Sequence, residues 1–325
     1  MGLFNRLIAR IDRFQQRHGA LGFPLAVRQK FADDQGGFLA ASVTYYAFFS
    51  IFPLLLVFVT LLGYALQGDP DLQRRVLDSA LADFPVIGPQ LKTNVHSLRG
   101  SAPALAVGIG VAVWAGTGVA LALENALDHI WGVPIRRRAN PLLARLRAVI
   151  WIAAIGGVTL IGTVLGSASA FASYGATARI AAALVSLAIN IAVFLAVFRV
   201  LTSHTPSWRD VLPGALIAAV AWEILQLAGG YIVDRQLRHA SSTYGVFAIV
   251  IGLLSWLYLA ANVTLLSAEI NVVAKYRLWP RSFSLITEQP LTVGDEHALR
   301  RRAGVEERRS DEDVSVGFDQ PEKRV

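Results

Sequence analysis

Three glutamates lie inside long apolar stretches of the sequence: Glu124, Glu223 and Glu269. A carboxylate at the centre of a bilayer costs about 2.5 to 3.5 kcal/mol on insertion scales. Membrane proteins therefore keep such a group where it faces a cavity, a partner or a transport pathway, or where protonation or a hydrogen bond across helices neutralises it. The three residues thus predict either a substrate or proton pathway or polar contacts between helices.

The residue types that metal and nucleophile chemistry require do not form a recognisable pattern. The six histidines are isolated along the chain and cysteine is absent. The sequence has no His-x-x-x-His pair, no Walker loop, no clustered Asp/His set and no Gly-x-Ser-x-Gly elbow. We therefore expect no enzyme activity, no metal site and no cofactor, and a membrane-bound hydrolase or nuclease is a distant third among the possible functions.

The composition is that of an integral membrane protein. Hydrophobic residues make up 54% of the 325 positions and charged residues 16%, against roughly a quarter charged in a soluble domain. A helix of about 20 apolar residues crosses the roughly 30 Å hydrocarbon layer. Six segments qualify, namely 39–66, 103–127, 148–171, 179–201, 211–233 and 246–274. The predicted fold is an all-α polytopic membrane protein with six transmembrane helices.

The distribution of positive charge predicts the orientation of these helices. When the loops are taken alternately, 23 of the 30 Lys and Arg residues fall on the side of the two termini. By the positive-inside rule both termini are cytoplasmic, and so is the loop that carries Arg136, Arg137 and Arg138. This excess also predicts attraction to anionic lipids at the cytoplasmic face. A nucleic-acid partner is not expected, because basic residues are not interleaved with exposed aromatic ones.

Three regions follow from these patterns. Residues 1–38 contain an amphipathic helix that lies on the cytoplasmic leaflet, followed by a lead-in to the first span. Residues 39–278 form the six-helix membrane domain, in which the loop at 67–102 contributes short amphipathic helices on the outer face. Residues 279–325 have the composition of a disordered cytoplasmic tail.

The glutamates differ in predicted depth. Glu223 lies about 18 Å along its span at 1.5 Å per residue, which makes it the deepest carboxylate. Glu124 and Glu269 fall near the cytoplasmic ends of their spans, where Asn125 and Asn271 accompany them. We expect Glu223 to face the bundle interior and the other two glutamates to border a cytoplasmic mouth that leads to it.

The first span has polar residues in its cytoplasmic half and a proline in its middle. Tyr45, Tyr46 and Ser50 are candidates to line the mouth. Pro53 frees the carbonyl of Phe49, which must be satisfied by a neighbour, by a hydroxyl such as that of Ser50, or by water. A kink that lines a pathway and a bend that merely fits a long helix to the bilayer both stay open.

Three further polar residues have structural interpretations. Asp210 is expected to be the N-cap of the fifth span. Asn190 and Asn262 fall near the middle of their spans, and both are expected to form hydrogen bonds between helices.

Dispersed motifs together carry a resemblance to one known family. The motifs are ASVTYYAFFSIFP (41–53), ENALDHIW (124–131), Pro206 to Asp210 leading to PGAL (213–216) and Trp222-Glu223, Tyr244-Gly245, and SWLYLAANVTLLSAEIN (255–271). Over residues 21–278 the chain resembles the YihY/BrkB family of bacterial inner-membrane proteins. One departure is Asp128, where the family more often has asparagine.

The resemblance implies a multi-pass protein of the bacterial cytoplasmic membrane. Members are linked to envelope integrity, serum resistance or export of lipid-linked material, and many are labelled ribonuclease BN. The residues argue against that label, because a metal-dependent nuclease needs a clustered His/Asp ligand set. Two hypotheses stay open: a transporter or flippase of a lipid or small solute, amphiphilic or ionic, and a noncatalytic scaffold that organises envelope machinery. The oligomeric state is also open.

Overall fold

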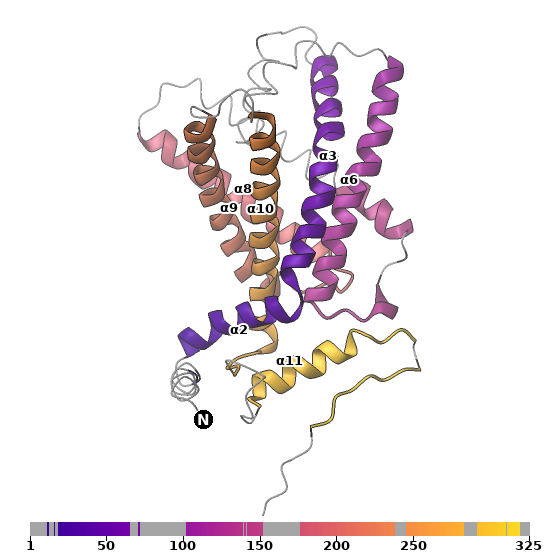
Figure 1. Ribbon diagram of the computed structural model, residues 1–325, viewed down its shortest axis with the longest axis vertical. Coiled ribbons are helices and arrows are strands. Elements are labelled where there is room, and N and C mark those ends of the chain that lie inside the picture. Colours follow the sequence, from indigo (N-terminus) through magenta and orange to yellow (C-terminus); the bar gives the residue numbers. More distant parts are fainter. Residues whose placement is uncertain are drawn as a thin grey trace, which may run out of the picture.

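In the computed structural model, long helices run side by side and two shorter helices lie across one end of them (Figure 1). The structure describes residues 19–65, 102–138, 142–151, 176–237, 245–282, 291–309 and 311–318, together with Asp12, Gln16, Asp71 and Asn140. Every regular element in this part of the chain is a helix, which confirms the all-α prediction. The predicted surface helix near the N-terminus and the predicted helices of the loop 67–102 lie outside the described residues.

The main body consists of long helices whose bounds agree with the predicted spans. They are α3 Gly36–Ala65, α6 Ala102–Ile130, α8 Ala176–Val200, α9 Trp208–Leu237 and α10 Gly245–Tyr276. At 1.5 Å per residue they are about 38 to 48 Å long, more than the roughly 30 Å hydrocarbon layer. Within the described residues, Ala183–Val200, Trp208–Gly229 and Val250–Tyr276 combine the length and apolarity of a membrane span.

The predicted third span, 148–171, is described only at its beginning, where residues 142–151 are helical. The count of six spans and the cytoplasmic location of the termini therefore stay predictions. α3 passes through Pro53 as one continuous helix, and the kink at this residue also stays a prediction.

Large apolar side chains cover the outer surfaces of the long helices. Phe38, Trp114, Leu227 and Phe247 are each at least 70% exposed, and α3 has no charged residue in 30 positions. In water such a surface drives association or aggregation. In a bilayer it contacts lipid tails, so the exposed surface is that of a membrane protein.

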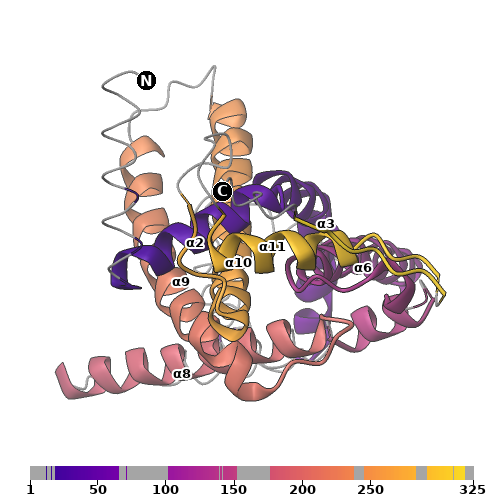
Figure 2. The ribbon, with the colours of Figure 1, turned by 90° about the horizontal axis from the view of Figure 1, so that it is seen from below.

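The helices pack in a chain of neighbours, with α3 against α6 and α10, and α9 against α8 and α10. The buried core is concentrated where α6, α8 and α10 end and α9 begins. Its largest fully buried side chains include Trp131, Phe198 and Leu265. Here α2 (Gly19–Asp33) and α11 (Val293–Gly304) cross the bundle, as Figure 2 shows from below. We call this the α2–α11 end.

α9 begins with a reciprocal cap. The backbone N–H of Ser207 donates to Asp210 Oδ2 over 3.1 Å, and the backbone N–H of Asp210 donates to Ser207 Oγ over 3.3 Å. Ser207 is therefore the N-cap and Asp210 the third helical residue of a capping box, one turn from the predicted role. Asp210 also forms an ion pair of 2.7 Å with Lys275 of α10, which joins the two helices.

α11 is fastened to the bundle through buried charges. Thr292 and Asp295 form a capping box at its start, and Asp295 is 0% exposed. Asp295 Oδ2 also accepts a hydrogen bond of 3.0 Å from the backbone N–H of Ser282. Arg281 lies between two carboxylates, with Nε 3.1 Å from Asp295 Oδ1 and Nη1 2.7 Å from Asp33 Oδ2.

This folded segment differs from the disordered tail that the composition suggests. α11 lacks an apolar stripe, so its sequence gives no helix-packing signal. Polar and cation–π contacts hold it instead. Arg301 lies 3.4 Å from the ring centroid of Tyr276 and donates to the carbonyl of Trp131 over 2.8 Å. Beyond the helix, Glu307 pairs with Arg136 at 2.7 Å.

Candidate functional site

Lys30, Asp34 and Glu269 form a group of buried charges at the α2–α11 end. Lys30 and Asp34 are 7% and 6% exposed, and Glu269 is 0% exposed. Lys30 Nζ forms an ion pair with Asp34 Oδ2 and lies 3.3 Å from Glu269 Oε2. It also donates a hydrogen bond of 3.0 Å to the carbonyl of Ile130, the last residue of α6. We call Lys30, Asp34 and Glu269 the buried triad.

The turn between α2 and α3 positions two members of the triad. Lys30 and Asp34 are one helical turn apart, so their side chains lie on the same face. Gln35 then adopts a left-handed conformation with φ of 54°, and α3 starts at Gly36. A Cβ atom at Gly36 would lie 2.3 Å from the ring of Phe31, so this close turn requires glycine.

The charge state of Lys30 follows from its neighbours. Burial by itself lowers the pKa of Lys30, because it disfavours the charged ammonium. Glu269 and Asp34 act in the opposite direction and outweigh this effect, so the pKa of Lys30 is raised above its ordinary value. Lys30 is therefore protonated at neutral pH, and the triad combines one positive charge with two carboxyl groups.

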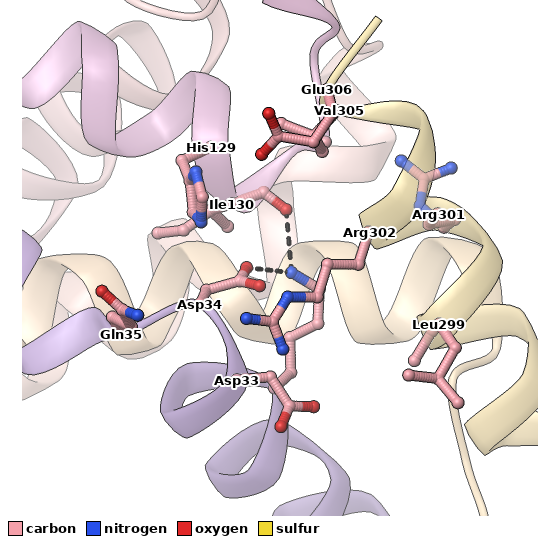
Figure 3. A pocket seen from close by; sticks show the side chains of 13 residues that line it. Asp33, Asp34, Gln35, His129, Ile130, Leu299, Arg301, Arg302, Val305 and Glu306 are labelled. Carbon is pink, nitrogen blue, oxygen red and sulfur yellow. Dashed lines mark hydrogen bonds and ion pairs between the residues drawn. The ribbon is translucent and has the colours of Figure 1, made fainter. Parts of the chain in front are cut away.

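A pocket of about 210 Å³ lies between α2, the end of α6 and α11 (Figure 3). The charged residues that line it are Lys30, Asp33, Asp34, Arg301, Arg302 and Glu306, and His129 is also part of the lining. Acidic and basic groups are equal in number. Such a lining suits water or a polar ligand better than an apolar molecule, since apolar pockets are lined mainly by hydrophobic side chains.

Glu124 belongs to a second buried group. Glu124 Oε1 accepts a hydrogen bond of 3.2 Å from Arg147 Nη2 and lies 3.5 Å from Ser203 Oγ. One turn further along α6, Asp128 accepts two bonds of 2.7 Å from Ser203, one from its backbone N–H and one from its hydroxyl. Both carboxylates are buried. This group fastens the loop between α8 and α9 to α6.

Glu223 lies in a third group, between α8 and α9. Its Oε1 accepts hydrogen bonds of 2.9 Å from Ser186 Oγ and 2.8 Å from Asn190 Nδ2. We call these three residues the α8–α9 site. Glu223 is half-buried, and its neighbours Ile224 and Leu227 are exposed. Glu223 therefore borders the apolar outer surface rather than an enclosed interior, while the expected interhelical bond of Asn190 is confirmed.

The tyrosines of α3 lie apart from the α8–α9 site. Tyr45 and Tyr46 are 59% and 44% exposed, and their rings pack edge to face at 5.5 Å. Tyr46 lies against Gly118 of α6, where a Cβ atom would come within 2.8 Å of its ring. Ser50 is buried and donates to the carbonyl of Ala47 over 2.9 Å, not to the carbonyl that Pro53 frees.

The asparagines have separate partners. Asn125 Oδ1 accepts a hydrogen bond of 2.7 Å from Arg138 Nη1 at the surface. Asn262 donates to the carbonyl of Tyr258 over 2.7 Å within its own helix, so the predicted interhelical bond is wrong. A hydroxyl or amide near mid-span can satisfy itself on the preceding turn, which spacing alone does not reveal.

Asn271 connects α10 to α9. Its Oδ1 accepts a hydrogen bond of 2.7 Å from the backbone N–H of Gly214. A Cβ atom at Gly214 would lie 2.2 Å from the carbonyl oxygen of Ser267, so the two helices approach each other closely only because this residue is glycine. Asn271 is thus a packing residue in this structure.

The three glutamates therefore have three different sets of partners. Sequence reasoning missed Lys30, Asp34 and Arg281, which lie in segments interpreted as lead-in and tail. The spacing of four residues between Lys30 and Asp34, just before the first apolar span, is a sequence signal of an ion pair along one helix face. Nothing near Arg281 in the sequence indicates its distant partners. In the part of the chain that the structure describes, no three potential metal ligands come together.

Comparison with known proteins places the chain among bacterial membrane proteins. The family described as Virulence factor BrkB matches residues 27–285. The UPF0761 membrane protein of Methylibium petroleiphilum is 29% identical over 284 residues, which cover 82% of this chain and 64% of that protein. The inner membrane protein YhjD of Escherichia coli is 25% identical over 295 residues, 82% of this chain and 85% of that protein.

A further relative is YfkH of Bacillus subtilis, which is named ribonuclease-like; it is 24% identical over 253 residues, 75% of this chain and 91% of that protein. The chain spans less than two thirds of the length of the Methylibium relative. No solved structure matches.

Proposed function

The chain belongs to the Virulence factor BrkB family of membrane proteins, and from this premise we propose that it is a transporter or flippase of the bacterial cytoplasmic membrane. Its substrate is amphiphilic or ionic, and its movement supports the integrity of the envelope. The α8–α9 site is the observation that carries the proposal, because it places a carboxylate next to a lipid-facing apolar surface.

The geometry of this site favours an amphiphilic substrate. Ser186 and Asn190 both bond to Oε1 of Glu223 in the described structure, so Oε2 is available to a hydroxyl or ammonium group. The adjacent side chains of Ile224 and Leu227 are 61% and 77% exposed. A polar head group can therefore bind Glu223 while its apolar tail stays on the outer surface of α9. This arrangement fits movement of a head group along the α8–α9 contact.

A carboxylate that only joins two helices is the competing interpretation. Hydrogen bonds between membrane helices are worth about 0.6 to 2 kcal/mol each, so a purely structural Glu223 should show its effect on stability. A pathway residue should instead affect transport while the folded protein persists. The two interpretations therefore differ in a single variant, Glu223→Gln, which keeps the shape and removes the charge.

The test uses protein reconstituted into phosphatidylethanolamine and phosphatidylglycerol vesicles that contain a fluorescent phosphatidylglycerol. Dithionite quenches the label on the outer leaflet, and the further loss of fluorescence reports lipid movement between leaflets. We expect movement with the wild type and movement reduced to the rate of protein-free vesicles with Glu223→Gln. Glu296→Gln, at a partly exposed position of α11, should cause no change. Equal rates for wild type and Glu223→Gln would remove Glu223 from the mechanism.

A noncatalytic scaffold is the second candidate, favoured by the exposed segment 311–318 that follows α11. Because Asp295 fastens α11 to Arg281, deletion of the whole tail would also remove a partner of buried Arg281. Deletion of residues 311–325 leaves those contacts intact. A scaffold should then lose partners in cross-linking experiments, whereas a transporter should keep its lipid movement.

We further propose that the protein is not an enzyme. Elemental analysis of the purified protein tests this, because a stoichiometric transition metal would revive the hydrolase or nuclease hypothesis.

A further inference from the structure

The buried triad contains two carboxyl groups but one ammonium group. Lys30 donates to Asp34 Oδ2 and to the carbonyl of Ile130, and these bonds use two of its three donors. Glu269 Oε2 lies 3.3 Å from Lys30 Nζ without hydrogen-bond geometry. Within the described residues neither oxygen of Glu269 accepts a hydrogen bond, although the side chain is 0% exposed.

An ionised carboxylate in this position is unfavourable. Burial removes its water shell, and the nearby Asp34 adds a like charge. A protonated Glu269 is neutral, and its carboxyl O–H can donate a hydrogen bond to Asp34. A metal cation would instead meet the Lys30 ammonium at close range, so a proton is the ligand that this site suits.

Other basic groups near the triad are engaged elsewhere or lie at the pocket surface. On the α2 side, Arg281 lies between Asp33 and Asp295. On α10, Lys275 pairs with Asp210 at 2.7 Å.

On α6 and α11 the facing groups belong to the pocket. Arg301 is stacked on Tyr276 and bonded to the carbonyl of Trp131. His129, Arg302 and Glu306 line the pocket, and α3 has no charged residue. No second cation in the described structure forms an ion pair with Glu269.

The triad also has a route to water. Lys30 and Asp34 line the pocket of about 210 Å³ under α11 (Figure 3). Glu269 is not among the lining residues and contacts Lys30, which is. Chains of Asp, Glu and His side chains form proton relays in membrane pumps and transporters. Here Asp34 lies near the enclosed Glu269 and also lines the pocket, whose lining includes His129.

We propose that the buried triad is a proton-binding site in which Glu269 and Asp34 share one proton at neutral pH and exchange it with water through the pocket under α11. The inference that a proton binds here depends on the geometry alone. The inference that this proton is the ion coupled to transport rests on the proposed transport function.

Infrared difference spectroscopy of the reconstituted protein tests the site. A protonated carboxylic acid has a carbonyl stretch that a carboxylate lacks. We expect one protonated carboxyl group per chain at pH 7, absent in Glu269→Gln and retained in the matched control Glu124→Gln, whose native carboxylate faces Arg147. Absence of the band in folded wild type, or a band that survives in both Glu269→Gln and Asp34→Asn, would overturn the proposal.

A second measurement covers a variant that fails to fold. In wild-type protein labelled with ¹³C-glutamate, the carbonyl band of the protonated acid should shift. An unshifted band would show that no glutamate carries the proton and would overturn its assignment to Glu269. Neither spectrum requires transport activity. A protein with the band but no lipid movement would refute the transport proposal and retain the proton site, whereas lipid movement that ignores an imposed pH gradient would refute the coupling.

Discussion

Replacing Asp295 with alanine is expected to release α11 from the helix ends that it covers. The Asp295 side chain is 0% exposed and lies 3.1 Å from Arg281 Nε. Its Oδ2 also accepts hydrogen bonds from the backbone N–H groups of Ser282 and Thr292, at 3.0 and 3.1 Å. The substitution removes these acceptors together. Of the two carboxylates that pair with buried Arg281, only Asp33 then remains.

The expected magnitude follows from the burial. Removing one partner of a buried ion pair costs about 3 to 5 kcal/mol, because the other charge stays buried. At about 1.4 kcal/mol for each factor of ten, the equilibrium for release of α11 shifts by roughly two to three and a half orders of magnitude. The bundle itself should persist, since its buried core cluster draws on the long helices, α2 and the segments that connect them.

Hydrogen exchange measured by mass spectrometry on protein in lipid nanodiscs reports this release. Amides of residues 293–304 should exchange faster in Asp295→Ala, while those of α9 and α10 should be unchanged. The control is Glu296→Ala on the same helix, because Glu296 Oε2 lies 3.9 Å from exposed Arg300 and such a surface pair is worth about 0 to 1 kcal/mol. Unchanged protection in Asp295→Ala, or equal effects of both variants, would refute the reasoning.

Three further outcomes are expected. Burial alone would raise the pKa of Asp295, but hydrogen bonds from Ser282 and Thr292 outweigh it and hold the pKa below its ordinary value. The stabilisation is therefore present above about pH 4 and lost as the pH falls through the lower folded-state pKa. A spin label at His297→Cys, the sole cysteine in the variant, should gain mobility only in acid, and equal mobility at pH 7 would contradict this. Gly214→Ala would place a Cβ atom 2.2 Å from the carbonyl oxygen of Ser267 and should lower the free energy of unfolding by about 1 to 3 kcal/mol. The control Gly110→Ala should not, because a Cβ atom there has nothing within 4 Å. Equal thermal midpoints of the two variants in detergent would count against the close contact at Gly214. Ser203→Ala removes the hydroxyl hydrogen bonds to buried Asp128 and Glu124 but keeps the backbone bond to Asp128. It should cost about 1 to 3 kcal/mol relative to exposed Ser255→Ala, and a wild-type midpoint would show that the hydroxyl does not fasten this loop.

The sequence predicts the positions of the long helices well, because apolar length is a property of single segments. The predicted spans 211–233 and 246–274 fall inside α9 and α10. The direction that a side chain faces is a different matter. α9 and α10 are apolar on most sides, so their composition does not show that Glu269 is enclosed while Glu223 borders the outer surface.

Contacts between distant segments set the rest of the structure. Lys30 reaches Glu269 from a helix that precedes the first span, and Arg281 joins Asp33 to Asp295 across three segments. Each segment looks like an ordinary polar stretch when read alone. Composition therefore predicts disorder for residues 293–304, because the stability of α11 comes from partners that its own sequence does not display.

The proposed transport function depends most directly on whether the α8–α9 site binds a lipid head group. The measurement is photocross-linking with a phosphatidylethanolamine that carries a diazirine on its head group, followed by mass spectrometry of the peptides. We predict that adducts concentrate around Ser186 and Glu223 and decline in Glu223→Gln. Adducts spread evenly over the exposed apolar residues of α3, α6 and α10, or unchanged in the variant, would contradict the account.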